Sequence, residues 1–162
     1  MNNKTNETKI VVLGGLGEVG KNMYCVMHKD AIVIIDAGVS FPESELMGID
    51  YVLPDFTFLK ENEDKIKALL ITHGHEDHIG GIPFLLQSIN IPAIYAPNHA
   101  KELISVKLTD KNIRYDNLFV YTENTKLKFK EIEIEFFRTT HSIPDSHGIS
   151  ITTPDGTIVT TG

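Results

Sequence analysis

The strongest constraint on the fold of this chain is the sequence His-Gly-His-Glu-Asp-His at residues 73–78, which follows an apolar run directly. The run, residues 68–72, has the length and composition of a short buried strand. Side chains alternate along an extended segment, so the first two histidines point the same way. Asp77 can cap a following helix and place His78 in its first turn. We therefore predict that these side chains converge on a dinuclear metal site.

The ligand chemistry of this motif favours zinc and similar ions. Neutral imidazole and carboxylate suit such ions, which can generate hydroxide from water near neutral pH. A polar loop with scattered histidines is the alternative, but three imidazoles within six positions are typical of a shared partner. A purely structural zinc site would favour several cysteines. The chain has one, Cys25, whose apolar neighbours predict a packing role.

Length and composition limit the remaining possibilities. A chain of 162 residues with 41% hydrophobic and 23% charged residues has the composition of one globular domain, and the sequence contains no apolar stretch of membrane-spanning length. Residues 1–8 are expected to be a disordered tail, and the location is expected to be cytoplasmic. The net charge of −7 argues against a broad basic surface. Two divalent ions would add local positive charge, so a polyanionic substrate stays possible.

A glycine-rich loop at residues 14–20 supports a rival hypothesis. It follows an expected strand at 9–13 and has G-x-G-x-x-G spacing, and Asp36 ends the next apolar run as a ribose-binding acid would. However, residues 22–28 are too few for a crossover helix and have the pattern of a strand. With a turn at residues 29–30 they form a hairpin, which places no helix N-terminus under a pyrophosphate. We therefore expect no nicotinamide cofactor.

The other elements are predicted from periodicity and turn residues. A long irregular stretch after Asp36, of the kind that lines sites, precedes the first helix. Helices are expected at 57–64, at 79–89 and from Pro97 onward, the last with Ala100, Leu103, Ile104 and Leu108 on one buried face. Strands are expected at 93–95, 118–121, 126–130, 132–138, 148–152 and 158–161. The pattern shows no repeat or second domain.

A second polar cluster, residues 139–147, follows one of these strands. Its position at a strand end makes His141 the fourth candidate histidine ligand, although a hydrogen-bonded turn histidine is the alternative. We interpret the remaining histidines, His28, His99 and His147, as ordinary surface residues.

These motifs together resemble the metallo-β-lactamase superfamily, whose αββα sandwich carries a dinuclear site along one edge. The resemblance spans nearly the whole chain. Four blocks are similar to a narrower group, the bacterial ribonuclease J family of β-CASP proteins: residues 14–23, 41–43 with 48–50, 72–81 and 140–146.

The resemblance implies a role for each site residue. One of two divalent ions, Zn²⁺ or alternatively Mn²⁺, would be held by His73, His75 and His141. The second would be held by Asp77 and His78. These two are the expected catalytic residues, with Asp77 as the expected proton acceptor. Asp36 would orient the histidine loop from behind, and Ser142 and Asp145 would position phosphate or water.

The resemblance also implies a function. Family members cut RNA internally and from the 5′ end with metal-activated hydroxide, in RNA decay and rRNA processing. Full-length relatives are expected to be homo-oligomers with RNA-decay partners. Other possibilities are a thioester or lactone hydrolase of the same superfamily and a non-catalytic metal-binding module.

Similar proteins continue past Gly162 with a bridging aspartate, a β-CASP domain and a C-terminal domain. We therefore expect residues 9–162 to form only the first half of the α/β sandwich. Such a half would lack its partner sheet and one wall of the RNA channel, and it would expose a strand edge near Ile158. Alone it should be weakly stable and nearly inactive.

Overall fold

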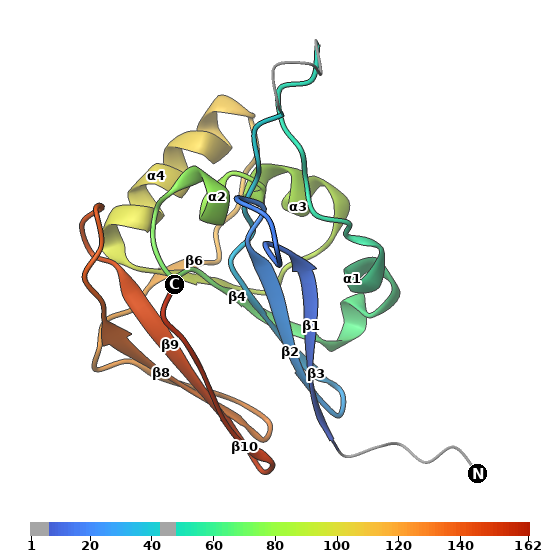
Figure 1. Ribbon diagram of the computed structural model, residues 1–162, viewed down its shortest axis with the longest axis vertical. Coiled ribbons are helices and arrows are strands. Elements are labelled where there is room, and N and C mark those ends of the chain that lie inside the picture. Colours follow the sequence, from blue (N-terminus) through green and yellow to red (C-terminus); the bar gives the residue numbers. More distant parts are fainter. Residues whose placement is uncertain (1–6, 43–47) are drawn as a thin grey trace.

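A computed structural model describes residues 7–42 and 48–162, and in it two β-sheets lie face to face (Figure 1). Helices cover the side of the larger sheet that faces away from the smaller one. The described residues thus form three layers, in the order α, β, β, of the predicted αββα sandwich. None of the helices in these two ranges is long and apolar enough to cross a lipid bilayer.

The larger sheet has six strands in sequence order. They are β1 (Thr8–Gly14), β2 (Met23–His28), β3 (Ala31–Ile35), β4 (Ile66–Leu70), β5 (Ile94–Ala96) and β6 (Leu118–Val120). Strands β1 to β3 pair antiparallel, and β3 to β6 pair parallel. Every residue of β3 is buried, as a strand covered on both faces requires. Thr8, expected in the disordered tail, begins β1, and residues 1–6 lie outside the described ranges.

The β1–β2–β3 arrangement decides against the dinucleotide hypothesis. The segment after the glycine-rich loop is strand β2, paired antiparallel on both sides, as the sequence predicted. A dinucleotide fold needs a helix there, whose N-terminus would face the pyrophosphate. The glycine-rich loop therefore leads from strand to strand.

The smaller sheet has four antiparallel strands in the order β10-β9-β8-β7. They are β7 (Lys126–Phe129), β8 (Ile132–Arg138), β9 (His147–Thr153) and β10 (Gly156–Thr160). The expectation that the sandwich lacks a partner sheet was wrong, because these hairpins supply one. Along β8, buried and exposed residues alternate, so one face packs inward and the other is solvated. Strand β10 lies at an edge of this sheet, as predicted for the region of Ile158.

Two apolar cores hold the layers together. One lies between the helices and the larger sheet and contains Cys25, whose predicted packing role is confirmed; burial raises the pKa of its thiol to about 12. The other lies between the sheets and contains Tyr121, stacked on Phe136 at a centroid distance of 3.6 Å. The Tyr121 hydroxyl donates a hydrogen bond of 2.6 Å to the carbonyl of Ile71, two residues before the histidine motif.

The helices are α1 (Thr57–Glu61), α2 (Glu76–Ile79), α3 (Ile82–Ser88) and α4 (Asn98–Asp110), with a 3₁₀ turn, η1, at Glu63–Lys65. The predicted inward stripe of α4 is confirmed, with Leu103 partly buried against the core. The single helix predicted at 79–89 is two helices, which Gly80 and Gly81 separate. Asp77 does not cap a helix either: α2 begins at Glu76, and Asp77 lies within its first turn.

Candidate metal centre

The histidine motif begins where β4 ends, in a segment held from both sides. The Ile71 N–H donates to the carbonyl of Tyr95 at 2.9 Å, and the Thr72 carbonyl accepts from the His147 N–H at 3.0 Å. Strand β4 ends at Leu70, two residues earlier than predicted, so Ile71 and Thr72 form a linker between sheet and motif. The backbone of this linker is hydrogen-bonded to both sheets. These bonds fix the direction in which the chain enters the histidine motif.

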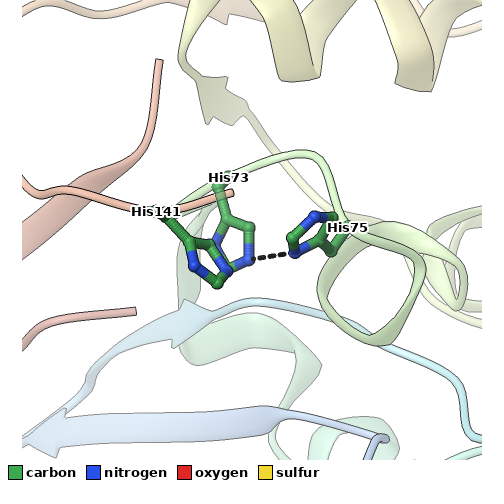
Figure 2. A group of neighbouring side chains, drawn as sticks. All are labelled: His73, His75 and His141. Carbon is green, nitrogen blue, oxygen red and sulfur yellow. Dashed lines mark hydrogen bonds between the residues drawn. The ribbon is translucent and has the colours of Figure 1, made fainter. Parts of the chain in front are cut away.

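Three imidazoles converge beside this linker, and Figure 2 shows them facing one another. One ring nitrogen from each of His73, His75 and His141 lies within 4.8 Å of the others. The closest pair, His73 Nε2 and His75 Nδ1, is 3.1 Å apart. Two nitrogens that bind one tetrahedral zinc ion at about 2.0–2.1 Å lie about 3.4 Å apart, so the closest pair already has nearly this spacing and any wider separation would have to close when the ion binds. The structure thus brings together two motif residues and a histidine more than sixty positions away.

His141 was the candidate with a competing explanation, as a hydrogen-bonded turn histidine. Its ring makes edge contacts with His73 and His75, at centroid distances of 4.6 and 4.8 Å. Within the described ranges the His141 ring makes no hydrogen bond. This environment favours a ligand over a turn residue, and coordination itself stays a prediction.

A hydrogen-bonded chain leads from His73 to Asp36 and fixes the imidazole tautomer. Thr72 Oγ1 lies 2.9 Å from both Asp36 Oδ2 and His73 Nδ1. The carboxylate can only accept, so the single hydroxyl hydrogen goes to Asp36 and His73 Nδ1 donates to the hydroxyl. The lone pair of His73 is therefore on Nε2, the nitrogen that faces His75. Such outer partners are typical of histidines that bind metals.

Asp36 also fixes the second part of the motif. His78 Nδ1 donates to Asp36 Oδ2 at 2.7 Å, and the Thr72 N–H donates to Asp36 Oδ1 at 2.8 Å. The opposite nitrogen, His78 Nε2, then lies 3.5 Å from Asp77 Oδ2. Asp77 and His78 form a pair beside the three histidines, since the rings of His73 and His78 are 4.0 Å apart. The predicted contact of Asp36 with the histidine loop is present.

The two buried histidines of the motif have opposite pKa shifts. Burial and, next, the neighbouring His78 lower the pKa of His73 to about 4, against the opposing charge of Asp36. Burial also acts to lower the pKa of His78, but the charge and hydrogen bond of Asp36, with the charge of Asp77, outweigh it and raise the pKa. His73 is therefore neutral near pH 7, as a metal ligand must be.

The two candidates for substrate contact lie in the segment after His141. Ser142 is exposed, and Asp145 is half-buried with a positive φ of 63°. Asp145 Oδ2 accepts from the N–H of His99, in the first turn of α4, at 3.5 Å. This contact ties the loop to the helix, and a role of either residue in holding phosphate stays a prediction.

Two histidines that were expected at the surface are buried. His28 is 3% exposed, and it lies 3.4 Å from Glu131 and 3.5 Å from Asp155. His147 is 1% exposed, and its Nδ1 donates to the carbonyl of Asp145 at 3.0 Å. The surface interpretation was wrong for both, because the packing of the two sheets covers the strand ends on which these histidines lie.

Asn22, which the sequence interpretation did not single out, contacts the motif directly. Its side-chain amide donates to Asp77 Oδ2 at 3.0 Å. The only signal in the sequence was its place at the end of the glycine-rich loop, within a block already similar to a known family.

Comparison with known proteins identifies the family. The model of the metallo-beta-lactamase superfamily matches residues 16–162. The chain belongs to the metallo-β-lactamase superfamily. The fold agrees with this match: the crystal structure of the metallo-beta-lactamase fold protein YhfI from Bacillus subtilis superposes with a TM-score of 0.61 at 19% identity, covering 96% of this chain and 62% of that one. The predicted fold class is thus confirmed.

Two curated ribonuclease J proteins are similar over almost all of this chain. Ribonuclease J 1 of Streptococcus pyogenes serotype M3 is 52% identical over 160 residues, which are 98% of this chain and 28% of that protein. Ribonuclease J of Mycoplasma pneumoniae is 47% identical over 156 residues, which are 96% of this chain and 27% of that protein. The resemblance to ribonuclease J is confirmed, and the chain spans 27–28% of the length of these relatives.

Proposed function

We propose that this chain forms part of a metal-dependent ribonuclease that hydrolyses RNA phosphodiesters. The observation that carries the proposal is the convergence of His73, His75 and His141 beside the pair of Asp77 and His78. Similarity to ribonuclease J, over 96–98% of the chain, supports RNA as the substrate class. We further propose that residues 9–162 supply part of the metallo-β-lactamase domain, with the β-CASP and C-terminal domains outside them.

Two divalent ions fit the available donors. Three imidazole nitrogens suit one zinc or manganese ion, and a carboxylate with an imidazole suits a second. When bound, such ions provide a nucleophile from water at neutral pH and neutralise charge on phosphate oxygens. This positive charge would offset the formal charge of −7 where the polyanionic substrate binds.

The residues of the chain would contribute orientation and proton transfer. Asp36 holds His78 by Nδ1, so that its Nε2 faces Asp77. The Asp77 carboxylate is 38% exposed and can accept the proton of an attacking water. Ser142, which is exposed beside His141, would donate to a phosphate oxygen.

The finer assignments belong to the same proposal and derive from the similarity to ribonuclease J. They are cleavage both from the 5′ end and internally, rRNA processing and RNA decay, and a cytoplasmic location where these substrates occur. Homo-oligomers and RNA-decay partners likewise stay predictions.

A chimera tests the proposed activity. We would replace the matching segment of the S. pyogenes ribonuclease J 1 with residues 1–162 of this chain, which align over 98% of their length. The chimera is expected to degrade 5′-monophosphorylated RNA until a chelator is added. His141→Ala in the chimera should lower the rate by more than the roughly 10–100-fold typical of outer partners of a metal. His99→Ala is the matched control, since His99 is not a proposed ligand.

Two outcomes would contradict the proposal. One is a folded, metal-loaded chimera that leaves RNA intact but hydrolyses a thioester or lactone, which would favour the other hydrolase class. The second is full activity of the His141→Ala chimera. Residues 1–162 alone serve as a further arm and should degrade RNA far more slowly than the chimera, because one wall of the RNA channel lies outside them.

A further inference from the structure

The glycine-rich loop, residues 14–20, leads through Lys21 to Asn22, whose side chain contacts the metal motif. Gly15, Gly17 and Gly20 all have positive φ, as does Lys21. A Cβ atom on Gly20 would lie 2.7 Å from the Cβ of Ser40, so the loop approaches the chain after β3 as only glycine allows. The Lys21 N–H donates to the carbonyl of Val39 at 3.0 Å. The loop therefore has a fixed position when it reaches residue 22.

Asn22 bridges the chain after β3 and helix α2 through its backbone. Its N–H donates to the carbonyl of Asp77 at 3.0 Å, and its carbonyl accepts from the N–H of Gly38 at 3.0 Å. Helix α2 has four residues and no side-chain cap, so it depends on such outside contacts.

The side chain of Asn22 faces the atoms proposed to bind the second ion. Its Nδ2 donates to Asp77 Oδ2 at 3.0 Å and to the Asp77 carbonyl at 3.1 Å, and it lies 3.3 Å from His78 Nε2. Among the described residues, this amide is the hydrogen-bond donor that contacts the Asp77 carboxylate. The Asn22 amide thus contacts both Asp77 and His78.

The chemistry of the amide suits this place. Asn22 is neutral, so it orients the Asp77 carboxylate and leaves its negative charge available to a cation. The neighbouring cation, Lys21, is paired with Glu18 at 3.0 Å. A lysine or arginine at position 22 would neutralise Asp77 and repel a metal ion.

We propose that Asn22 is a positioning residue for the second metal ion, which aligns the Asp77 carboxylate with the His78 ring. The inference rests on the proposed function, because Asp77 and His78 are proposed ligands there. Outer partners of this kind change metal affinity by about 10–100-fold. The role of the glycine-rich loop would then be to position the Asn22 side-chain amide at this site.

Asn22→Ala tests the inference, because alanine keeps both backbone hydrogen bonds and removes only the amide. We would titrate the metal-free wild-type and variant chains with Cd²⁺ and follow the two sites by ¹¹³Cd NMR, with His141→Ala to assign the first. In Asn22→Ala the dissociation constant of the second site should rise about 10–100-fold, with the first site unchanged. Asn117→Ala is the matched control, since its amide donates to the carbonyl of Pro92 at 3.0 Å.

Each result is decisive. Equal Cd²⁺ affinities of Asn22→Ala and wild type, or an equal loss at both sites, would overturn the inference and leave the proposed function intact. A wild-type chain with one ion at the three histidines would overturn the inference and the roles of Asp77 and His78 as ligands. A wild-type chain that binds no Cd²⁺ would instead contradict the proposed metal centre.

Discussion

Gly38→Ala is expected to destabilise the chain by about 3–5 kcal/mol, near the upper end of single-residue effects. A Cβ atom at position 38 would lie 1.6 Å from the carbonyl oxygen of Asp77, which is backbone that no rotamer change can move aside. The segment that contains Gly38 and helix α2 must therefore move apart, and Asp77 and His78 must move with the helix. Urea denaturation of the metal-free chain measures the loss.

Gly17→Ala is the matched control for this effect. Gly17 has a φ of +72°, and a Cβ atom there would meet nothing within 4 Å. The cost should be the backbone strain alone, about 1–2 kcal/mol. If Gly38→Ala lost no more stability than Gly17→Ala, the close approach of residue 38 to α2 would be wrong.

Asp36→Ala should have a loss of similar size, about 3–5 kcal/mol, because it removes one partner from a buried ionic network. Asp36 is 2% exposed and accepts from the backbone and hydroxyl of Thr72 and from His78. Without the carboxylate, the buried N–H of Thr72 loses its acceptor. The pKa of His78 should also fall, since Asp36 raises it. Urea denaturation and the NMR titration of His78 measure the two effects.

Asp36→Asn separates the effect of the shape of the Asp36 side chain from the effect of its negative charge. Asparagine tolerates the positive φ of 58° at this position and keeps an acceptor for the Thr72 N–H. Its loss should be about 1–2 kcal/mol, while the pKa of His78 should fall as in the alanine variant. Equal stability of Asp36→Ala and wild type would mean that Asp36 does not anchor the motif.

Local patterns predicted most of the fold. The apolar run of β3, the hairpin at residues 29–30 and the inward stripe of α4 depend on neighbours in sequence, and the structure confirms them. The motif and the strand end before His141 predicted the convergence of the histidines, which is present, although β4 ends at Leu70 and strand alternation does not set the directions of His73 and His75.

What the sequence did not predict depends on tertiary contacts. His28 and His147 are buried because the two sheets pack over them. A local sequence pattern does not show how two sheets pack against each other. The contact of Asn22 with Asp77 joins residues 55 positions apart. The partner sheet was expected to be missing because family members are longer, yet the four strands β7 to β10 form one that covers the inner face of β3.

Calorimetric titration of the metal-free chain with Zn²⁺, in wild type and in His141→Ala, tests most directly whether His73, His75 and His141 share one ion. We expect tight binding by the wild type and, in His141→Ala, an affinity lower by more than about 100-fold, with His99→Ala unchanged. Absence of Zn²⁺ binding by the folded wild-type chain, or an unchanged affinity in His141→Ala, would contradict the metal centre.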